Sequence, residues 1–216
     1  MKNKLMWVLC AGCSAGAPPT DVSEAHFAAE MEDLAAMASG FAQAAAGAAA
    51  AFDGVGDCTW TPEVAPDGLG GQAAVALEAA PCGVELPTEP PVAYTLSAGA
   101  YAFTWQLRPG GITVDGGGER SASLTRSLAD GEVWPASQEL RSLTVEASPD
   151  GEVEAWSASA TWTTLRGGQW SLDADFEGGE GEVTLTHADG GSCEVAGAPG
   201  AFTVSCGGRA GVAAAR

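Results

Sequence analysis

Two hydrophobic periodicities divide this chain of 216 residues. In the N-terminal part, large apolar residues recur at alternating four- and three-residue spacings, and alanines continue the stripe: Phe27, Met31, Leu34, Ala38, Phe41, Ala45, Ala48 and Phe52. Such spacing is typical of one face of an α-helix. Asp21 is a suitable N-cap, and Glu24 follows it three positions later as in a capping box. We therefore predict a helix from about Asp21 to about Phe52.

From Cys58 onward, apolar residues alternate with small or polar ones, which is typical of half-buried strands. Two examples are the runs Tyr101, Phe103, Trp105, Leu107 and Trp170, Leu172, Ala174, Phe176. Turn signals recur at Pro109-Gly110-Gly111, Asp115-Gly116, Asp130-Gly131, Asp150-Gly151, Gly167-Gly168, Gly178-Gly179, Asp189-Gly190 and Pro199-Gly200. Because no helical pattern interrupts them, we predict sequential antiparallel hairpins, a β-meander of about 8 to 11 strands.

The two patterns together predict one α+β domain over residues 21–206. An isolated helix of this composition buries too little apolar surface to be stable alone, and its alanine-rich stripe permits close approach to a partner surface. We expect the long helix to pack on a curved antiparallel sheet and to fill its concave face. A coiled-coil dimer is the alternative, but the stripe lacks flanking pairs of opposite charge, which favours a monomer. Residues 207–216 have the composition of a flexible tail.

The first residues follow neither pattern. Lys2 and Lys4 precede the apolar run Leu5-Met6-Trp7-Val8-Leu9, and Ala11 and Gly12 then lead to Cys13. The run is far shorter than the roughly twenty residues that a transmembrane helix needs, and it has the features of a signal peptide. The small residues before Cys13 resemble the lipobox of bacterial lipoproteins, although Cys10 stands where that motif prefers leucine.

This resemblance implies that residues 1–12 are a signal peptide, that Cys13 carries the lipid, and that residues 13–20 tether the domain to a membrane. Because Ser14 rather than aspartate follows the cysteine, it also implies the bacterial outer membrane, on the periplasmic or the surface side. An ordinary secretory signal cleaved after Gly12 is the alternative.

Four further cysteines are an even number, which suits two disulfides in an oxidising compartment. A hairpin centred between Pro199 and Gly200 would place Cys193 opposite Cys206, so we predict a bridge between them. Cys58 would then pair with Cys82 by elimination. A zinc site of four cysteines is the alternative, but no two of them have the close spacing that zinc sites favour.

The composition is strongly acidic. Removing Lys2 and Lys4 with the signal leaves seven arginines, no lysine and 28 acidic residues, hence a formal charge of −21. This balance argues against nucleic acid as a partner. It permits a basic protein partner or a cation, while solubility alone is the simpler explanation.

Few residues offer catalytic chemistry. His26 and His187 are the only histidines, and no Gly-x-Ser-x-Gly motif accompanies either. The lack of lysine after the signal removes Schiff-base and phosphate-loop chemistry. We therefore predict no catalytic residue and no cofactor, and a small hydrolase that uses His187 is the alternative.

Two weak candidate ligand sites remain. Asp173, Asp175 and Glu177 match the first positions of a calcium loop, but Thr184 stands where that loop needs a glutamate, and the alternation favours a solvated strand face. Arg126 is in phase with apolar neighbours on an expected inward face, where it would need an acidic partner or a ligand anion.

The expected function follows from these points. Six tryptophans lie in the strand region, and they either fill the core or line a cavity for an apolar or sugar ligand: Trp60, Trp105, Trp134, Trp156, Trp162 and Trp170. We expect an envelope lipoprotein whose domain is a non-enzymatic binding or scaffolding module. A carrier of lipid or another apolar ligand, with the sheet as a half-barrel, is the alternative.

Overall fold

A computed structural model describes residues 24–48, 50–54, 56–86, 92–124 and 134–206. These form one helix and a 12-stranded sheet. The elements are α1 (Glu24–Ala45), β1 (Phe52–Asp53), β2 (Thr59–Asp67), β3 (Gly70–Glu78), β4 (Cys82–Leu86), β5 (Val92–Arg108), β6 (Gly111–Leu124), β7 (Pro135–Ala147), β8 (Val153–Thr164), β9 (Gln169–Glu177), β10 (Glu180–His187), β11 (Ser192–Ala196) and β12 (Thr203–Cys206). The predicted signal peptide, Cys13, the tether, Arg126 and the C-terminal tail lie outside the described residues.

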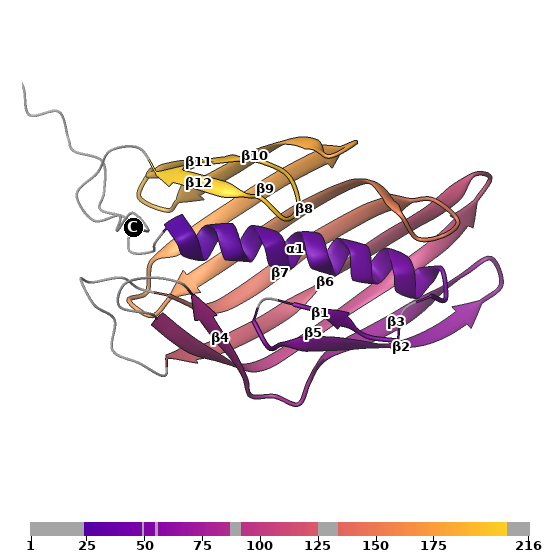
Figure 1. Cartoon of the computed structure of the whole chain (residues 1–216), viewed down its shortest axis with the longest axis horizontal. Coiled ribbons are helices and arrows are strands. Elements are labelled where there is room, and N and C mark those ends of the chain that lie inside the picture. Colours follow the sequence, from indigo (N-terminus) through magenta and orange to yellow (C-terminus); the bar gives the residue numbers. More distant parts are fainter. Residues whose placement is uncertain (1–23, 49, 55, 87–91, 125–133, 207–216) are drawn as a thin grey trace, which may run out of the picture.

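The sheet is the predicted antiparallel meander. Its strand order is β1-β2-β3-β5-β6-β7-β8-β9-β10-β11-β12, and β4 pairs with β5 beside this path. The long β5 makes this possible, since residues 100–106 pair with β3 and residues 92–96 pair with β4. The sheet curves strongly without closing (Figure 1). The 12 strands slightly exceed the predicted number because short elements such as β1 also join the ladder.

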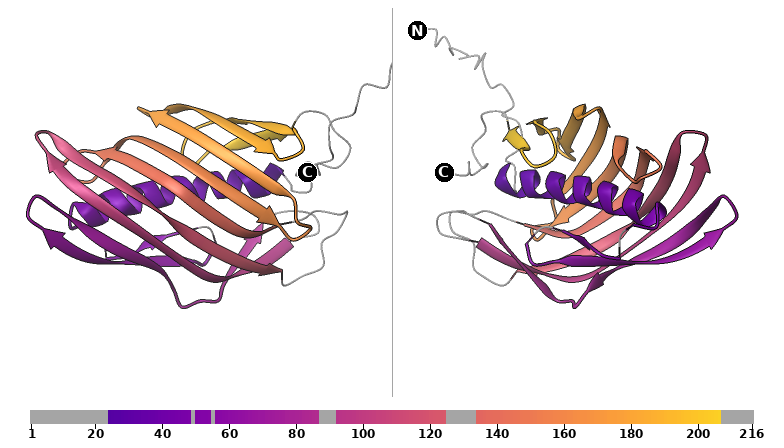
Figure 2. Two further views of the ribbon diagram at one scale, coloured as in Figure 1. Left: turned by 180° about the vertical axis from the view of Figure 1, so that it is seen from behind. Right: turned by 45° about the vertical axis from the view of Figure 1, so that its right-hand side comes forward.

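Helix α1 lies across the concave face of the sheet, so that the strands lie in front of it when the molecule is seen from behind (Figure 2). The predicted stripe faces the sheet: Phe27, Met31, Leu34, Ala38 and Phe41 are all buried. All six tryptophans of the strand region are also buried and fill the space beneath the helix. Helix and sheet therefore share one core. Among the described residues, no helix combines the length and the apolar character that crossing a membrane requires.

The helix ends at Ala45, earlier than predicted. Gly47 takes a left-handed conformation with φ of 74°, the Ala48 amide donates to the Gln43 carbonyl at 2.9 Å, and the Gly47 amide donates to the Ala44 carbonyl at 3.0 Å. This pair of bonds is a Schellman C-cap. The prediction that Ala48 and Phe52 continue the helical stripe was wrong. Phe52 instead lies in β1 and packs back on the helix, where the centroids of the Phe52 and Phe41 rings are 6.0 Å apart.

Two details of the strand prediction were also wrong. Asp115-Gly116 lies within β6 and forms no turn. A Cβ at Gly116 would lie 2.8 Å from Phe103 Cβ and 2.9 Å from the Ala102 carbonyl oxygen of β5, and 3.1 Å from the Phe41 ring of the helix. Leu107 has the inward phase of Tyr101, Phe103 and Trp105, yet it is 46% exposed near the end of β5.

Both predicted disulfides are present. Cys193 lies opposite Cys206 in the ladder between β11 and β12, and Val195 lies opposite Val204, as the hairpin register required. Cys58 is bonded to Cys82, which connects the start of β2 to the start of β4. One bridge therefore fastens the last hairpin of the sheet, and the other fastens β4, which lies beside the main strand order.

Candidate functional site: a charged cluster beneath the helix

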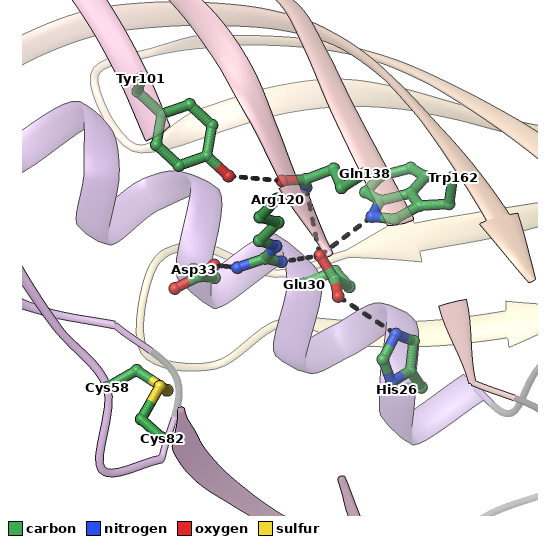
Figure 3. Close-up of polar contacts among 9 residues, drawn as sticks. All are labelled: His26, Glu30, Asp33, Cys58, Cys82, Tyr101, Arg120, Gln138 and Trp162. Carbon is green, nitrogen blue, oxygen red and sulfur yellow. Dashed lines mark hydrogen bonds and ion pairs between the residues drawn. A yellow bond between two sulfur atoms is a disulfide. The ribbon is translucent and has the colours of Figure 1, made fainter. Parts of the chain in front are cut away.

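The most unusual chemical feature is a group of polar side chains buried between α1 and the sheet (Figure 3). Glu30 and Asp33 come from the helix and are 4% and 1% exposed, and Arg120 of β6 is 5% exposed. They lie together because Arg120 has the inward phase of β6 and the two acids belong to the covered side of the helix. Charged groups are almost never buried to this extent unless they are paired.

Arg120 forms ion pairs with both carboxylates. One terminal nitrogen, Nη2, bonds to Glu30 Oε2, and the other, Nη1, bonds to Asp33 Oδ2. The planar guanidinium thus bridges two acids that are three residues apart on one helix face. This arrangement restricts both the sliding of the helix along its axis and its rotation about that axis.

Neutral donors complete the hydrogen bonding of Glu30. The Trp162 indole nitrogen donates to Glu30 Oε2 at 3.0 Å, and the Gln138 amide donates to the same oxygen at 3.2 Å. His26 Nε2 lies 3.1 Å from the other oxygen, Oε1. One carboxylate therefore receives contacts from α1, β6, β7 and β8.

The network extends to Tyr101 of β5, whose hydroxyl donates to Gln138 Oε1 at 2.9 Å. Gln138 is thus fixed at both ends of its amide, since it accepts from Tyr101 and donates to Glu30. The His26 ring also packs edge-on against Trp134, with centroids 4.1 Å apart. Aromatic side chains thus enclose the polar cluster.

The pKa values follow from this enclosure. Burial alone would raise the pKa of Glu30, but the Arg120 charge and the hydrogen bonds from His26 and Trp162 outweigh it and lower the pKa to about 2. Burial lowers the pKa of His26, although the contact with Glu30 opposes this shift. Burial raises the pKa of Tyr101 well above its usual value, and the Glu30 charge adds to the effect. Near neutral pH, Glu30 is therefore ionised, while His26 and Tyr101 are neutral.

The cluster is suited to holding structure rather than to catalysis. A general base needs a pKa near the working pH and access to a substrate, whereas the pKa of Glu30 is about 2 and its carboxylate is saturated with donors and closed off. The hollow beside it, lined by Glu30, Arg120, Gln138 and Trp162 among others, has a volume of only about 10 Å³. A cavity of that size holds at most about one water molecule.

Helix α1 is fastened on a second side by two other glutamates. Glu32 accepts from the backbone amides of Gly200 and Phe202 at 2.6 and 2.9 Å, and Glu24 accepts from the Cys206 amide at 2.7 Å. These contacts join the helix to β12 and to the turn before it. The concave face of the sheet is therefore occupied by a helix that is tied both at its centre and at one edge.

The predicted site residues do not come together. His187 is buried at the end of β10, with Nδ1 3.7 Å from Asp189 Oδ2 and its ring against Trp170. Asp173, Asp175 and Glu177 occupy alternate exposed positions of β9 on the face away from the helix. Within the described ranges, no three His, Cys, Asp or Glu side chains are arranged to hold a metal ion.

The sequence reasoning selected Arg126 as the inward arginine and missed Arg120. The signal was present, because Arg120 shares its phase with Ile112, Val114 and Ala122 on the same strand. Two acids also adjoin the apolar stripe of the helix, next to Met31 and Leu34. These phases indicate an inward arginine on the strand and two acids beside the buried stripe of the helix, but they do not identify the partners.

The outer, convex face of the sheet contains the larger hollows. Three of them, of about 710, 770 and 500 Å³, are lined mainly by outward side chains of β2, β3, β5, β6, β7 and β8. Many outward positions there are alanine, glycine, serine or threonine, and the one helix in the described part of the chain lies on the opposite face (Figure 2).

Comparisons with known proteins found no match for this chain among protein families, curated proteins or solved structures.

Proposed function

We propose that the chain is a bacterial envelope lipoprotein, anchored through Cys13, whose domain is a non-enzymatic binding or scaffolding module. One observation supports this most: the concave face, where a half-barrel carrier would hold its ligand, is occupied by the protein's own helix. A ligand there would have to displace buried aromatic side chains and a paired charge cluster. The accessible hollows are on the other face of the sheet.

Two further observations support the proposal. The disulfides, Cys58 to Cys82 and Cys193 to Cys206, suit a protein that folds in an oxidising compartment. The polar cluster uses its donors and acceptors internally, so its burial does not require a substrate. The outer membrane is the proposed location, because Ser14 follows the cysteine of the lipobox-like segment.

The anchor is tested by expressing the chain in a bacterium with labelled fatty acid. The protein should incorporate label and partition into the detergent phase, and Cys13→Ser should abolish both. Cys10→Leu is the control: it removes the other cysteine of this segment, supplies the residue that the lipobox prefers, and should keep both properties. Labelling that persists in Cys13→Ser would refute the anchor.

The non-carrier role is tested by native mass spectrometry of the purified chain. We expect the mass of the protein with its covalent lipid alone, and no shift in tryptophan fluorescence on adding apolar probes. The curvature of the open sheet is the observation that favours a carrier (Figure 1). A stoichiometric, non-covalently bound lipid would replace the binding-module proposal with a carrier.

A further inference from the structure

A row of minimal side chains crosses the outer face of the sheet. Glu63 of β2 lies opposite Ala74 of β3, Ala74 lies opposite Ala102 of β5, and Ala102 lies opposite Gly117 of β6. Together with neighbours from adjacent rows and Arg141 of β7, these residues line the hollow of about 770 Å³, which we call the outer trough. Neighbouring strands are about 4.8 Å apart, so the trough crosses roughly 20 Å, the length of about six extended residues.

The residues that form the floor of the trough are small. A Cβ at Gly117 would lie 2.7 Å from the Leu140 carbonyl oxygen, because the ladder between β6 and β7 shifts register at this point. Ala74 and Ala102 are both exposed and contribute only methyl groups. The floor is therefore apolar, shallow and unable to accept a larger side chain at Gly117 without a backbone shift.

Carboxylates dominate the rim. Glu63 and Asp115 line the trough itself, and Glu119 and Glu139 line the neighbouring hollow of about 500 Å³. Asp115 is oriented by the Thr144 hydroxyl, which donates to it at 2.9 Å. Arg141 is the single basic residue that lines the trough.

We propose that the outer trough binds an extended segment of a partner protein that carries lysine or arginine side chains. An aliphatic stem of such a side chain fits against alanine methyls, and its charged end then reaches the rim carboxylates. This inference rests on the proposed function, because it assigns a face and a partner chemistry to the binding module.

Charge complementarity decides between the occupants of this face. The chain after the signal carries a formal charge of −21, so a second copy would bring a like charge to the same acidic surface. An anionic lipid surface or a nucleic acid would be repelled in the same way. A basic polypeptide brings the opposite charge together with a backbone that can lie across the strands.

The test uses the detergent-purified full chain and a dye-labelled hexapeptide of alternating lysine and threonine, with binding measured by fluorescence anisotropy at low salt. Glu63→Gln with Asp115→Asn should weaken binding about tenfold, since each exposed charge pair contributes modestly. The control Asp173→Asn with Asp175→Asn removes the same charge from another part of the outer face. It should change the dissociation constant by less than about twofold.

Two further variants separate a shaped site from general attraction. Ala102→Trp should fill the floor and abolish binding, while the unfolding temperature stays close to that of the parent. Arg141→Gln should tighten binding about twofold, because it removes the one repulsive charge at the trough. Equal losses for the two carboxylate pairs, displacement of the peptide by spermidine at equal charge concentration, or absence of binding would each overturn the proposal.

These outcomes are distinct from failure of the proposed function. Loss of the anchor would appear as persistent labelling in Cys13→Ser and would leave peptide binding unchanged. A carrier role would appear as bound lipid in native mass spectrometry, irrespective of the trough variants. Failure of the peptide assay alone would therefore remove the trough assignment and leave the anchor intact.

Discussion

The same strands form the two faces of this sheet, but the faces differ in composition and in burial. Toward the helix, alternate positions carry large apolar residues and a single cluster of charges in which every ion is close to an opposite charge. Away from the helix, many alternate positions carry small or acidic residues, and no helix or strand of the described residues covers them. Because side chains alternate between the two faces, the inward residues pack against the helix, and the outward residues stay exposed to solvent.

The largest difference between the faces should appear on removing an arginine from each. Arg120→Met leaves Glu30 and Asp33 buried without their counter-ion, so the free energy of unfolding should fall by about 3 to 5 kcal/mol in urea denaturation. The matched change Arg141→Met on the outer face should alter it by no more than about 0.5 kcal/mol. Similar losses for the two variants would show that the cluster does not stabilise the fold.

Acid should distinguish the two faces almost as strongly. The pKa of Glu30 is about 2 in the folded chain against an ordinary value of 4.5, so the unfolded chain binds its proton first as the pH falls. The stabilisation that Glu30 provides is present above about pH 4.5 and is lost toward pH 2, and it amounts to about 3 kcal/mol.

His26 acts in the same direction at higher pH. Its pKa is lowered by burial, so below its ordinary value of 6.5 the unfolded chain takes up a proton that the folded chain excludes, and stability begins to fall. Urea denaturation between pH 7 and pH 2 measures both effects. Glu30→Gln should flatten the decline between pH 4.5 and pH 2, whereas Glu139→Gln on the outer face should leave it unchanged. A decline unaffected by Glu30→Gln would contradict the proposed cause.

The aromatic part of the core should respond to truncation. Phe41 is fully buried and stacks on Phe103 with ring centroids 4.4 Å apart, so Phe41→Ala should lower the free energy of unfolding by roughly 3 kcal/mol. Leu107→Ala, at a position 46% exposed on β5, should cost less than about 1 kcal/mol. A small loss for Phe41→Ala would indicate that the helix packs loosely on the sheet.

The smallest effect is expected on the outer face, with the opposite sign. Asp175 of β9 lies opposite Glu182 of β10, and like charges at directly opposed positions are mildly destabilising. Asp175→Asn should therefore raise the free energy of unfolding by a few tenths of a kcal/mol at low salt, and high salt should remove the gain. A loss of stability would mean that Asp175 has a favourable partner, such as a bound cation.

Much of the inner face could be predicted from sequence, because local pattern determines it. Period-two runs such as Trp170 to Phe176 predicted the strands, and the symmetry of the Pro199-Gly200 hairpin predicted its disulfide. The helix stripe from Phe27 to Phe41 predicted the buried side of α1. In each case the physical cause, alternation or turn symmetry, acts within a few residues or across one hairpin.

The errors lie where tertiary contact overrides local pattern. Gly116 resembles part of a turn, but it lies within β6, where a Cβ would crowd both β5 and the Phe41 ring of the helix. Gly47 lies inside the predicted helix, whereas its left-handed backbone ends the helix. The charge cluster joins residues far apart in the sequence, such as Glu30 and Arg120, which are 90 positions apart, and no local rule pairs them. The sequence alone could establish their inward phase but not their partners.

Hydrogen exchange of the helix amides tests the central claim most directly, namely that the helix is a permanent part of the core and not a lid over a ligand site. We predict that amides of residues 31–42 exchange only through global unfolding, with the same opening free energy as the central strands β5 to β8. An opening free energy of the helix clearly below that of those strands would contradict this account, because the concave face could then be vacated while the sheet stays folded.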